Sequence, residues 1–204
     1  MMNILCVDDH PLFLEGIATA IGSQDDMQLA AVASSGREAI AQYRKVRPDI
    51  TLMDLRLPDM SGIAAMAAIR SEFPDARIII LTTFEGDVEI QRALAGGARA
   101  YLIKSMPLAE FVDVIRKVER GRTYLPMQIA QNLAQHVGSD VLSGREVEIL
   151  TQVAEGNRNR DIGTRLAISE DTVKSHLRHI LEKLGAKDRT EAVAIGIRRG
   201  IIHL

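Results

Sequence analysis

Residues 3–9 read NILCVDD, an apolar strand-like run that ends in two aspartates. Three more runs have the same form, each with one polar residue behind it: Asp49–Met53 before Asp54, Arg77–Leu81 before Thr82, and Ala100–Ile103 before Lys104. Short apolar runs bounded by polar residues are typical of buried strands. In an open parallel sheet the carboxyl ends of the strands border one crevice. We therefore expect these polar groups to converge there: Asp8, Asp9, Asp54, Thr82 and Lys104.

The chemistry of this set suits a divalent cation together with a phosphoryl group. Carboxylate oxygens bind a hard cation such as Mg²⁺, and an ammonium or a hydroxyl can hold phosphate oxygens. One carboxylate can itself be the group that is phosphorylated. Taken singly, an aspartate after a strand is often only a turn former or a helix N-cap. The complementary chemistry of the whole set favours a functional site.

Helix-period stretches separate the apolar runs, and Gly and Pro residues punctuate them. The expected helices are Pro11–Ile21, Arg37–Arg47, Ile63–Phe73, Asp87–Ala95 and Leu108–Arg120. A further strand, Gln28–Ala33, has no special residue at its end. Five strands alternating with helices predict a doubly wound α/β fold with a flavodoxin-like parallel sheet. Gly121 ends this part of the chain.

The composition is that of an ordinary globular protein. The 204 residues fit one large or two small domains, with 47% hydrophobic and 25% charged residues. The one cysteine, Cys6, lies inside the first run, so we expect a buried thiol and no intrachain disulfide. No run approaches the roughly 18 apolar residues of a membrane span, and no signal peptide is visible. We expect a cytoplasmic protein with no membrane partner.

The remainder of the chain is helical. A short stretch, Pro126–His136, leads to a predicted hinge at Gly138–Asp140. Ser143 and Glu146 have the spacing of a capping box for a helix that runs to Ala154. Further helices are expected at Asn159–Leu166, at Glu170–Leu184 with Ser169 as N-cap, and at Thr190–Arg199. A short helix, a tight turn and a longer helix form a helix-turn-helix arrangement. The predicted divisions are 1–121, a linker at 122–139, and 140–204.

The longer helix has two distinct faces. Its apolar stripe is formed by Val173, Leu177, Ile180, Leu181 and Leu184, and Lys174, Ser175 and Arg178 lie on the other side. The net charge of the chain is −2, and residues 140–204 carry 11 basic against 10 acidic residues. The pattern alone therefore leaves DNA contact and a merely solvated face equally open.

Four stretches resemble the receiver domain of bacterial two-component response regulators, over about the first 120 residues: CVDDHPLF, LMDLRLPDMSG, IIILTTF and GGARAYLIKS. The resemblance implies that Asp54 is the phosphoacceptor and that Mg²⁺ or Mn²⁺ is held by Asp8, Asp9, Asp54 and the backbone carbonyl of Arg56. It further implies a switch hydroxyl at Thr82, a phosphate-binding Lys104 and an aromatic switch residue at Tyr101. Many receivers have a proline after the lysine, joined by a cis bond. Here Ser105 follows, so the geometry of that peptide stays open.

Residues 142–150 and 154–193 closely resemble the LuxR-type helix-turn-helix, through LSGREVEIL and AEGNRNRDIGTRLAISEDTVKSHLRHILEKLGAKDRTEAV. The resemblance places Lys174, Ser175 and Arg178 at base edges, and Asn159, Thr172 and His176 near the DNA backbone. The two halves together resemble a NarL/FixJ-type response regulator. That family implies a sensor histidine kinase as phosphoryl donor, double-stranded DNA as partner, and a homodimer on phosphorylation or on DNA. The chain is then not an enzyme, because the phosphoryl transfer acts on itself.

The sequence also allows two other functional interpretations, and two interpretations of the terminal helix. A haloacid-dehalogenase-like phosphohydrolase needs an aspartate two residues after its nucleophile, whereas Asp8 and Asp9 are adjacent and His10 follows. A regulator that needs no phosphorylation is disfavoured, because the set of Asp8, Asp9, Asp54, Thr82 and Lys104 is intact.

In the terminal helix, Ala192, Ile195 and Ile197 can either pair across a two-fold axis or cover the core of their own domain.

Overall fold

The computed structural model describes residues 1–83, 86–135 and 142–202. The chain divides into two compact units: Met1–Phe84 with Ile90–Ala130, called the first unit, and Glu85–Glu89 with Gln131–Leu204, called the second unit. Within the described ranges, no helix is both long and apolar enough to span a lipid bilayer. The predicted hinge at Gly138–Asp140 lies outside the described residues.

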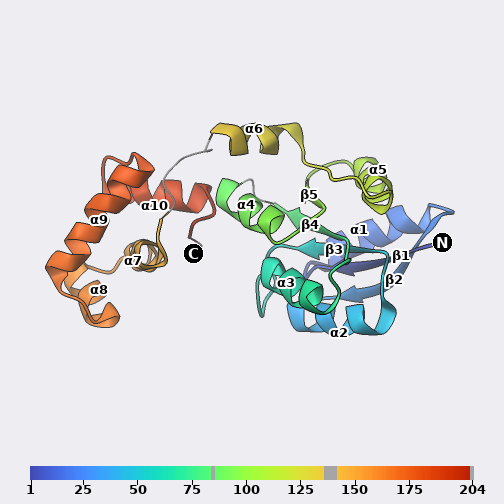
Figure 1. Ribbon diagram of the computed structural model, residues 1–204, viewed down its shortest axis with the longest axis horizontal. Helices are drawn as coiled ribbons and strands as arrows, with labels where there is room; N and C mark the ends of the chain where they lie inside the picture. Colours follow the sequence, from blue (N-terminus) through green and yellow to red (C-terminus); the bar gives the residue numbers. More distant parts are fainter. Residues whose placement is uncertain (84–85, 136–141, 203–204) are drawn as a thin grey trace. The chain divides into compact units, whose positions relative to one another are not determined.

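The first unit is built on a five-stranded sheet of order β2-β1-β3-β4-β5, in which every neighbouring pair is parallel (Figure 1). The strands are β1 (Met2–Val7), β2 (Met27–Ala33), β3 (Ile50–Asp54), β4 (Ile78–Thr82) and β5 (Ala100–Ile103). One helix follows each strand: α1 (Pro11–Gly22), α2 (Gly36–Val46), α3 (Gly62–Glu72), α4 (Asp87–Ala95) and α5 (Leu108–Glu119). The predicted doubly wound fold is confirmed.

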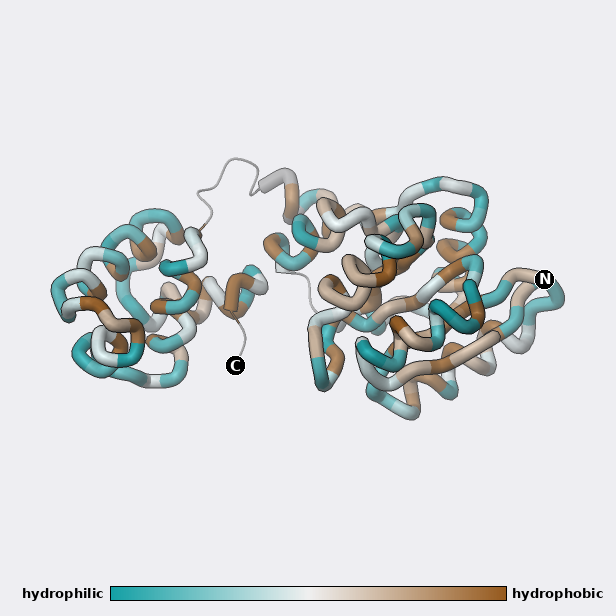
Figure 2. Tube along the Cα trace, turned by 60° about the horizontal axis from the view of Figure 1, so that its bottom comes forward, coloured by the Kyte–Doolittle hydropathy of each residue, from teal (hydrophilic) through white to brown (hydrophobic). Residues whose placement is uncertain are grey.

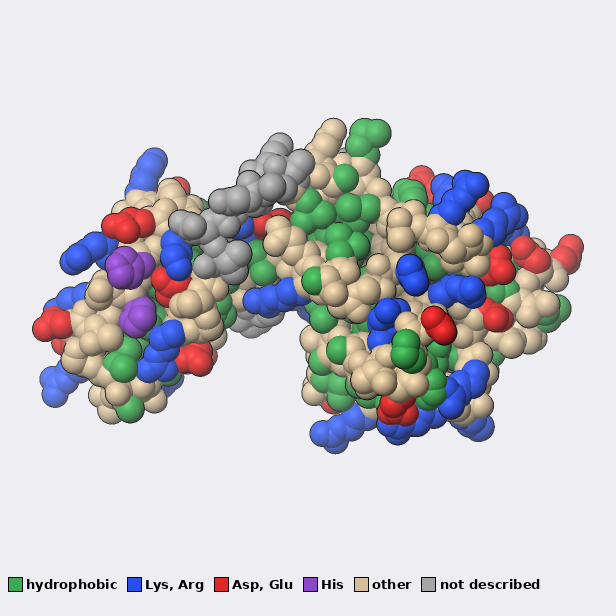
Figure 3. All heavy atoms as spheres, in the orientation of Figure 1, with side chains coloured by type: hydrophobic (Ala, Val, Ile, Leu, Met, Phe, Trp, Pro, Cys, Tyr) green, Lys and Arg blue, Asp and Glu red, His purple; other side chains and the backbone are tan. Residues whose placement is uncertain are grey.

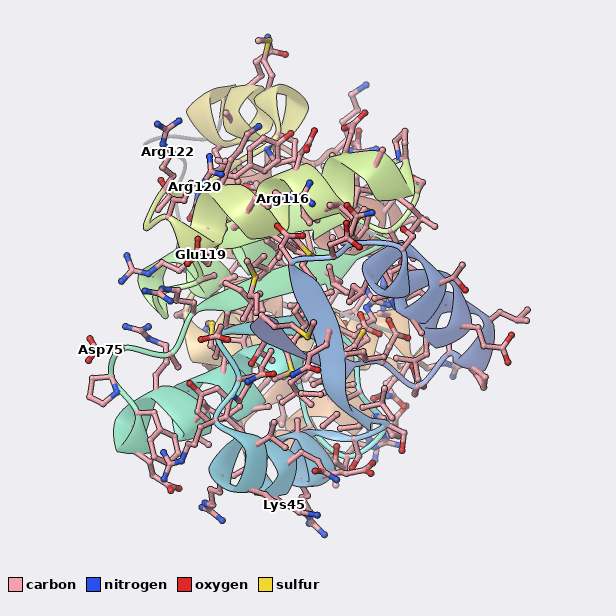
Figure 4. All side chains as sticks on the ribbon, turned by 90° about the vertical axis from the view of Figure 1, so that its right-hand side faces the viewer. Lys45, Asp75, Arg116, Glu119, Arg120 and Arg122 are labelled. Carbon is pink, nitrogen blue, oxygen red and sulfur yellow. The ribbon has the colours of Figure 1, made fainter. Side chains whose placement is uncertain are left out.

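Both faces of this sheet are buried, as a parallel sheet requires. On one face, Ile4, Cys6 and Leu52 pack against apolar residues of α1 and α5 such as Ile17 and Phe111. Successive side chains of a strand point to opposite faces. The residues that alternate with this set therefore face the other side, where α2 and α3 pack against each other. Charged residues such as Lys45, Arg116 and Arg120 lie on the outer sides and ends of the helices (Figure 4).

Two strands end one residue later than expected. Asp54 pairs with Leu81 and Thr82 pairs with Ile103 in the parallel ladder, so both polar residues are the last members of their strands. The backbone of each is therefore fixed by the sheet rather than by a loop. The Cys6 thiol is buried, as predicted, and burial raises its pKa to about 12.

The chain after Gly121 continues along the free edge of β5. Tyr124 forms a parallel bridge with Ala100, and the amide of Tyr101 donates a hydrogen bond of 3.2 Å to the Tyr124 carbonyl. The helix α6 (Met127–Gln135) follows. The first residues of the predicted linker thus add to the sheet edge.

The second unit contains the helices α7 (Gly144–Ala154), α8 (Asn159–Leu166), α9 (Glu170–Leu184) and α10 (Arg189–Arg198). Hydrophilic and hydrophobic residues alternate along these helices (Figure 2). The predicted stripe of α9 is confirmed, since Val173, Ile180 and Leu184 are core residues and Leu177 and Leu181 pack against them. In α10, Ala192 belongs to this same core and Ile195 and Ile197 pack against it, which favours the core-covering alternative for these residues.

The turn between α8 and α9 is tight because the backbone at Ile168 packs closely against Gly163. A Cβ at this position would lie 2.8 Å from the carbonyl oxygen of Ile168. Ala167 ends α8 in the left-handed conformation, with φ 54°. Ser169 then caps α9, accepting a hydrogen bond of 3.0 Å from the Thr172 amide. These features hold the turn between α8 and α9 in its tight conformation.

The predicted capping box of α7 is present and carries a third partner. The Ser143 hydroxyl accepts a hydrogen bond from the Glu146 amide, and the Glu146 carboxylate accepts one from the Ser143 amide at 2.7 Å. The Lys183 ammonium, from α9, donates to the same carboxylate at 2.8 Å. Burial would raise the pKa of Glu146, but the hydrogen bonds from Lys183 and Ser143 outweigh it and lower that pKa.

Glu146→Gln should lower the free energy of unfolding of the second unit by roughly 1–3 kcal/mol at neutral pH, because the carboxylate that accepts the 2.8 Å hydrogen bond from Lys183 loses its charge. The pKa of Glu146 is lowered in the folded state, so this stabilisation is present above the ordinary value of 4.5 and is lost as the pH falls through the folded pKa. The difference from wild type should therefore shrink at acid pH. Urea unfolding followed by circular dichroism measures it. Glu182→Gln, at an exposed position of α9, is the control and should show no such loss.

Candidate functional site

The Lys104 ammonium joins two aspartates at the carboxyl edge of the sheet. Its Nζ lies 2.6 Å from Oδ2 of Asp8 and 2.9 Å from Oδ2 of Asp54. The three side chains are 9%, 0% and 5% exposed. They come from the ends of β5, β1 and β3, which the strand order brings together. The predicted convergence of Asp8, Asp54 and Lys104 is therefore confirmed.

Asp9 and His10 complete the acidic side of this site. The Asp9 side chain is 39% exposed, and its Oδ1 lies 2.8 Å from Nδ1 of His10. One ligand atom from each of Asp8, Asp9, His10 and Asp54 lies within 4.8 Å of the others. The predicted acid pair thus faces the same space as Asp54, with a histidine that the sequence interpretation had not included.

The donor set fits a divalent cation. Two of its carboxylates, those of Asp8 and Asp54, are buried, and hard cations take carboxylate oxygens. The backbone carbonyl of Arg56, which the resemblance makes a metal ligand, belongs to the loop that follows β3. The backbone amide of Arg56 donates a hydrogen bond of 3.4 Å to Oδ1 of Asp54.

The loop between β3 and α3 is held tightly against Asp54. The Gly62 amide donates to the Leu55 carbonyl at 2.8 Å, and a Cβ at Gly62 would lie 2.0 Å from the backbone oxygen of Asp54. Farther along the loop, the Asp59 carboxylate accepts hydrogen bonds of 2.8 and 3.0 Å from the amides of Gly36 and Arg37. The loop is therefore anchored both to β3 and to the start of α2.

The pKa values of the central pair are both displaced upward. Burial raises the pKa of Asp54, and the hydrogen bond from Lys104 offsets only part of that effect. For Lys104, burial acts to lower the pKa, but its hydrogen bonds to Asp54 and Asp8 prevail and raise it. Lys104 therefore remains a cation beside these carboxylates.

Thr82 and Tyr101 lie on the face of the sheet opposite to α1 and α5. Each alternates with residues of the core on that side, Leu81 on β4 and Leu102 on β5. Both side chains are buried, and Tyr101 is 0% exposed. The ring of Tyr101, the residue that the resemblance makes the aromatic switch, therefore lies inside the protein in this structure. None of the described peptide bonds is cis, which answers the question about Lys104–Ser105.

One aromatic contact of the site was missed. The Phe13 ring, in the first turn of α1, lies with its centroid 5.0 Å from the Lys104 ammonium and makes an edge contact with Phe111, at 6.1 Å between ring centroids. A cation over an aromatic face is attracted to it. The sequence signal was only an apolar residue shortly after the acids, which also fits an ordinary core position.

In the second unit, Lys174, Ser175 and Arg178 are exposed on α9, on the side away from its core stripe. The Lys174 ammonium pairs with Glu170 at 3.2 Å and with Asp171 at 3.1 Å. The Thr172 hydroxyl lies 2.8 Å from the Ser169 hydroxyl within the N-cap, and Asn159 and His176 are half-buried. Basic and acidic side chains are interspersed on the visible face of this unit (Figure 3).

Comparison with known protein families assigns both parts. Residues 4–116 match the response regulator receiver domain, and residues 140–195 match the bacterial regulatory proteins of the luxR family. The chain belongs to the response regulator family. This response regulator carries a receiver domain followed by a LuxR-type DNA-binding domain.

Full-length relatives agree with this assignment. The response regulator is 38% identical over 214 residues to the uncharacterized transcriptional regulatory protein YxjL of Bacillus subtilis, covering 99% of this chain and 98% of YxjL. It is 33% identical to the response regulator protein VraR of Staphylococcus aureus, covering 99% of both chains. A solved structure, the response regulator ChrA of a heme-sensing two-component system, is 32% identical with a TM-score of 0.58, covering 98% of both chains.

Gly62→Ala should disturb the receiver domain of this response regulator, because the added methyl group collides with the backbone of Asp54. Overpacking of this kind costs roughly 1–3 kcal/mol. Gly16→Ala is the matched control, since no atom lies within 4 Å of its added methyl group and it sits inside α1. The control should gain stability, by up to about 1 kcal/mol. Urea unfolding of both variants checks this, and equal stability of the two would contradict the close contact.

Proposed function

We propose that this response regulator is phosphorylated on Asp54 and that the phosphorylated form controls transcription by sequence-specific binding to DNA. The observation that carries the proposal is the buried arrangement of Lys104 between Asp8 and Asp54. The phosphoryl donor is a sensor histidine kinase, as expected for a receiver domain. The chain acts on itself and on no separate substrate, so it is a regulator and not an enzyme.

The chemical step is the attack of an Asp54 carboxylate oxygen on the phosphorus of the donor. A new P–O bond forms while the bond from phosphorus to the donor's nitrogen breaks, and that nitrogen leaves with its electron pair and takes up a proton. Asp8, Asp9 and the Arg56 carbonyl would hold Mg²⁺ or Mn²⁺ together with Asp54. When bound, the cation offsets the negative charge of the phosphoryl oxygens.

Lys104 and Thr82 then respond to the new phosphoryl group. The ammonium already lies 2.9 Å from Asp54, so it can donate to a phosphoryl oxygen with little movement. The Thr82 hydroxyl, at the end of the neighbouring strand β4, is the second donor. Because the Tyr101 ring is already buried, we assign the conformational change to the Thr82 end of β4 and the chain behind it rather than to entry of the ring.

DNA binding is assigned to the exposed side of α9. We propose that Lys174, Ser175 and Arg178 contact base edges, and that Asn159, Thr172 and His176 lie near the phosphates. One recognition helix reads only a few base pairs, so we propose a homodimer on two half-sites. We accordingly propose a cytoplasmic location, where the protein meets both DNA and a kinase donor.

Asp54→Asn should abolish phosphorylation by acetyl phosphate in the presence of Mg²⁺, because the amide is not a nucleophile. The fold should be retained, since the side chain keeps its size. Intact mass before and after the reaction gives the result. Asp59→Asn is the control, as it removes a carboxylate of the same loop that binds backbone amides of α2. A phosphoryl group on the Asp54→Asn protein would refute the assignment.

Lys174→Ala and Arg178→Ala should each reduce discrimination between operator and scrambled DNA by roughly 1–3 kcal/mol if these residues read bases. Binding curves at several salt concentrations separate this from phosphate contact, which would weaken all sequences equally and flatten the salt dependence. Lys187→Ala, exposed and outside α9, is the control and should leave discrimination unchanged. Footprinting of the phosphorylated protein tests the dimer, and protection of a single half-site would exclude it.

A further inference from the structure

His10 occupies an unusual place beside the acidic pocket. Its Nδ1 lies 3.0 Å from Oδ1 of Asp8 and 2.8 Å from Oδ1 of Asp9. Its backbone amide donates to the same Asp8 oxygen at 2.9 Å. The imidazole is therefore held against one oxygen of each carboxylate, while Oδ2 of Asp8 is left to Lys104.

The local backbone fixes this placement. His10 is the N-cap of α1, with φ −97° and ψ 105°, and Pro11 follows at the first helical position. A residue before proline is restricted to such extended conformations. An N-cap side chain ordinarily accepts a hydrogen bond from the helix, whereas the His10 side chain makes no capping hydrogen bond and faces the carboxylates instead. A residue that gives up its usual local role beside a functional site suggests a role in that site.

The spacing of the three atoms fits a metal coordination shell. Neighbouring ligands of an octahedral ion, each about 2.1 Å from the metal, lie about 3.0 Å apart. The two separations at His10 are 2.8 and 3.0 Å. Adding Asp54, all four groups offer ligand atoms within 4.8 Å of one another, close to the roughly 4.2 Å between opposite ligands of the same shell. Small side-chain movements complete the set.

We propose that His10 is a further ligand of the cation site and that it favours divalent transition metals over Mg²⁺. The inference deepens the proposed function, because it names the residue that sets the preference among cations. Imidazole nitrogen suits metals such as Co²⁺ and Zn²⁺, whereas Mg²⁺ prefers oxygen ligands and keeps its waters. In the free protein, Nδ1 faces two carboxylate oxygens, which only accept, so it carries the proton of that contact. On cation binding this proton leaves Nδ1 for solvent or for Nε2, and the freed Nδ1 lone pair binds the cation.

The test is direct cation binding to the unphosphorylated full chain without a polyhistidine tag, measured by titration calorimetry with MgCl₂ and with CoCl₂. His10→Ala should lower the affinity for Co²⁺ by roughly tenfold or more, since the loss of even an outer partner of a metal ligand has an effect of this size. Its affinity for Mg²⁺ should be nearly unchanged. His179→Ala, exposed on α9, is the matched control and should bind both ions as the wild type does. Asp9→Asn should bind both ions more weakly.

A second measurement needs no variant. In the wild-type protein with ¹⁵N-labelled histidine, Zn²⁺ should shift the Nδ1 resonance of His10 and leave that of His179 in place. An equal loss of affinity for Co²⁺ and for Mg²⁺ in His10→Ala would overturn the proposal, because His10 would then only orient the carboxylates. Tighter binding of both ions would also overturn it, since the ring would then compete with the cation. Failure of the proposed function can be distinguished from failure of this inference. If the proposed function is wrong, acetyl phosphate does not phosphorylate the wild-type protein, whatever its cation affinities.

Discussion

The Lys104 ammonium between Asp8 and Asp54 is the interaction on which the site depends. Charges removed from water are costly unless they are paired, and here the three side chains are 9%, 0% and 5% exposed. The pairing is possible only because the order β2-β1-β3-β4-β5 brings the ends of β1, β3 and β5 to one edge. The long crossovers of a parallel sheet, which α1 to α4 provide, make that order possible.

The same arrangement makes the site responsive. Lys104 already contacts Asp54, and the Phe13 ring and the buried surroundings limit where its side chain can go. A phosphoryl group on Asp54 would offer new oxygens to a cation that is in place. Under the proposed function, the larger displacement then falls to the neighbouring strand end at Thr82, since Lys104 has little distance to travel. Rigid anchoring on one side of the aspartate thus directs the change to the other side.

The sequence predicts the fold well where the signal is local. Apolar runs followed by polar residues located four of the strands, an apolar run alone located β2, and the helical stripe of α9 identified its core side. The contacts that the sequence did not predict depend on how residues come together in three dimensions. The contact of Gly62 with the Asp54 backbone, the Phe13 ring over Lys104 and the His10 ring against two carboxylates each join groups whose meeting no periodicity encodes. Asp54 and Thr82 were placed beyond their strands because ladder pairing is likewise non-local.

Two lysines of the chain show how burial decides what an ion pair does. Lys104 and Lys174 each pair with two carboxylates at similar distances, but their side chains are 9% and 52% exposed. Exposed pairs contribute little to stability and weaken further with salt, so DNA phosphates or bases can replace Glu170 and Asp171 as partners of Lys174. A buried pair is far more costly to break, because a charge is then left without a partner. The receiver lysine is therefore a fixed element of its site, whereas the α9 lysine is free to exchange partners, and the proposed DNA contact requires that exchange.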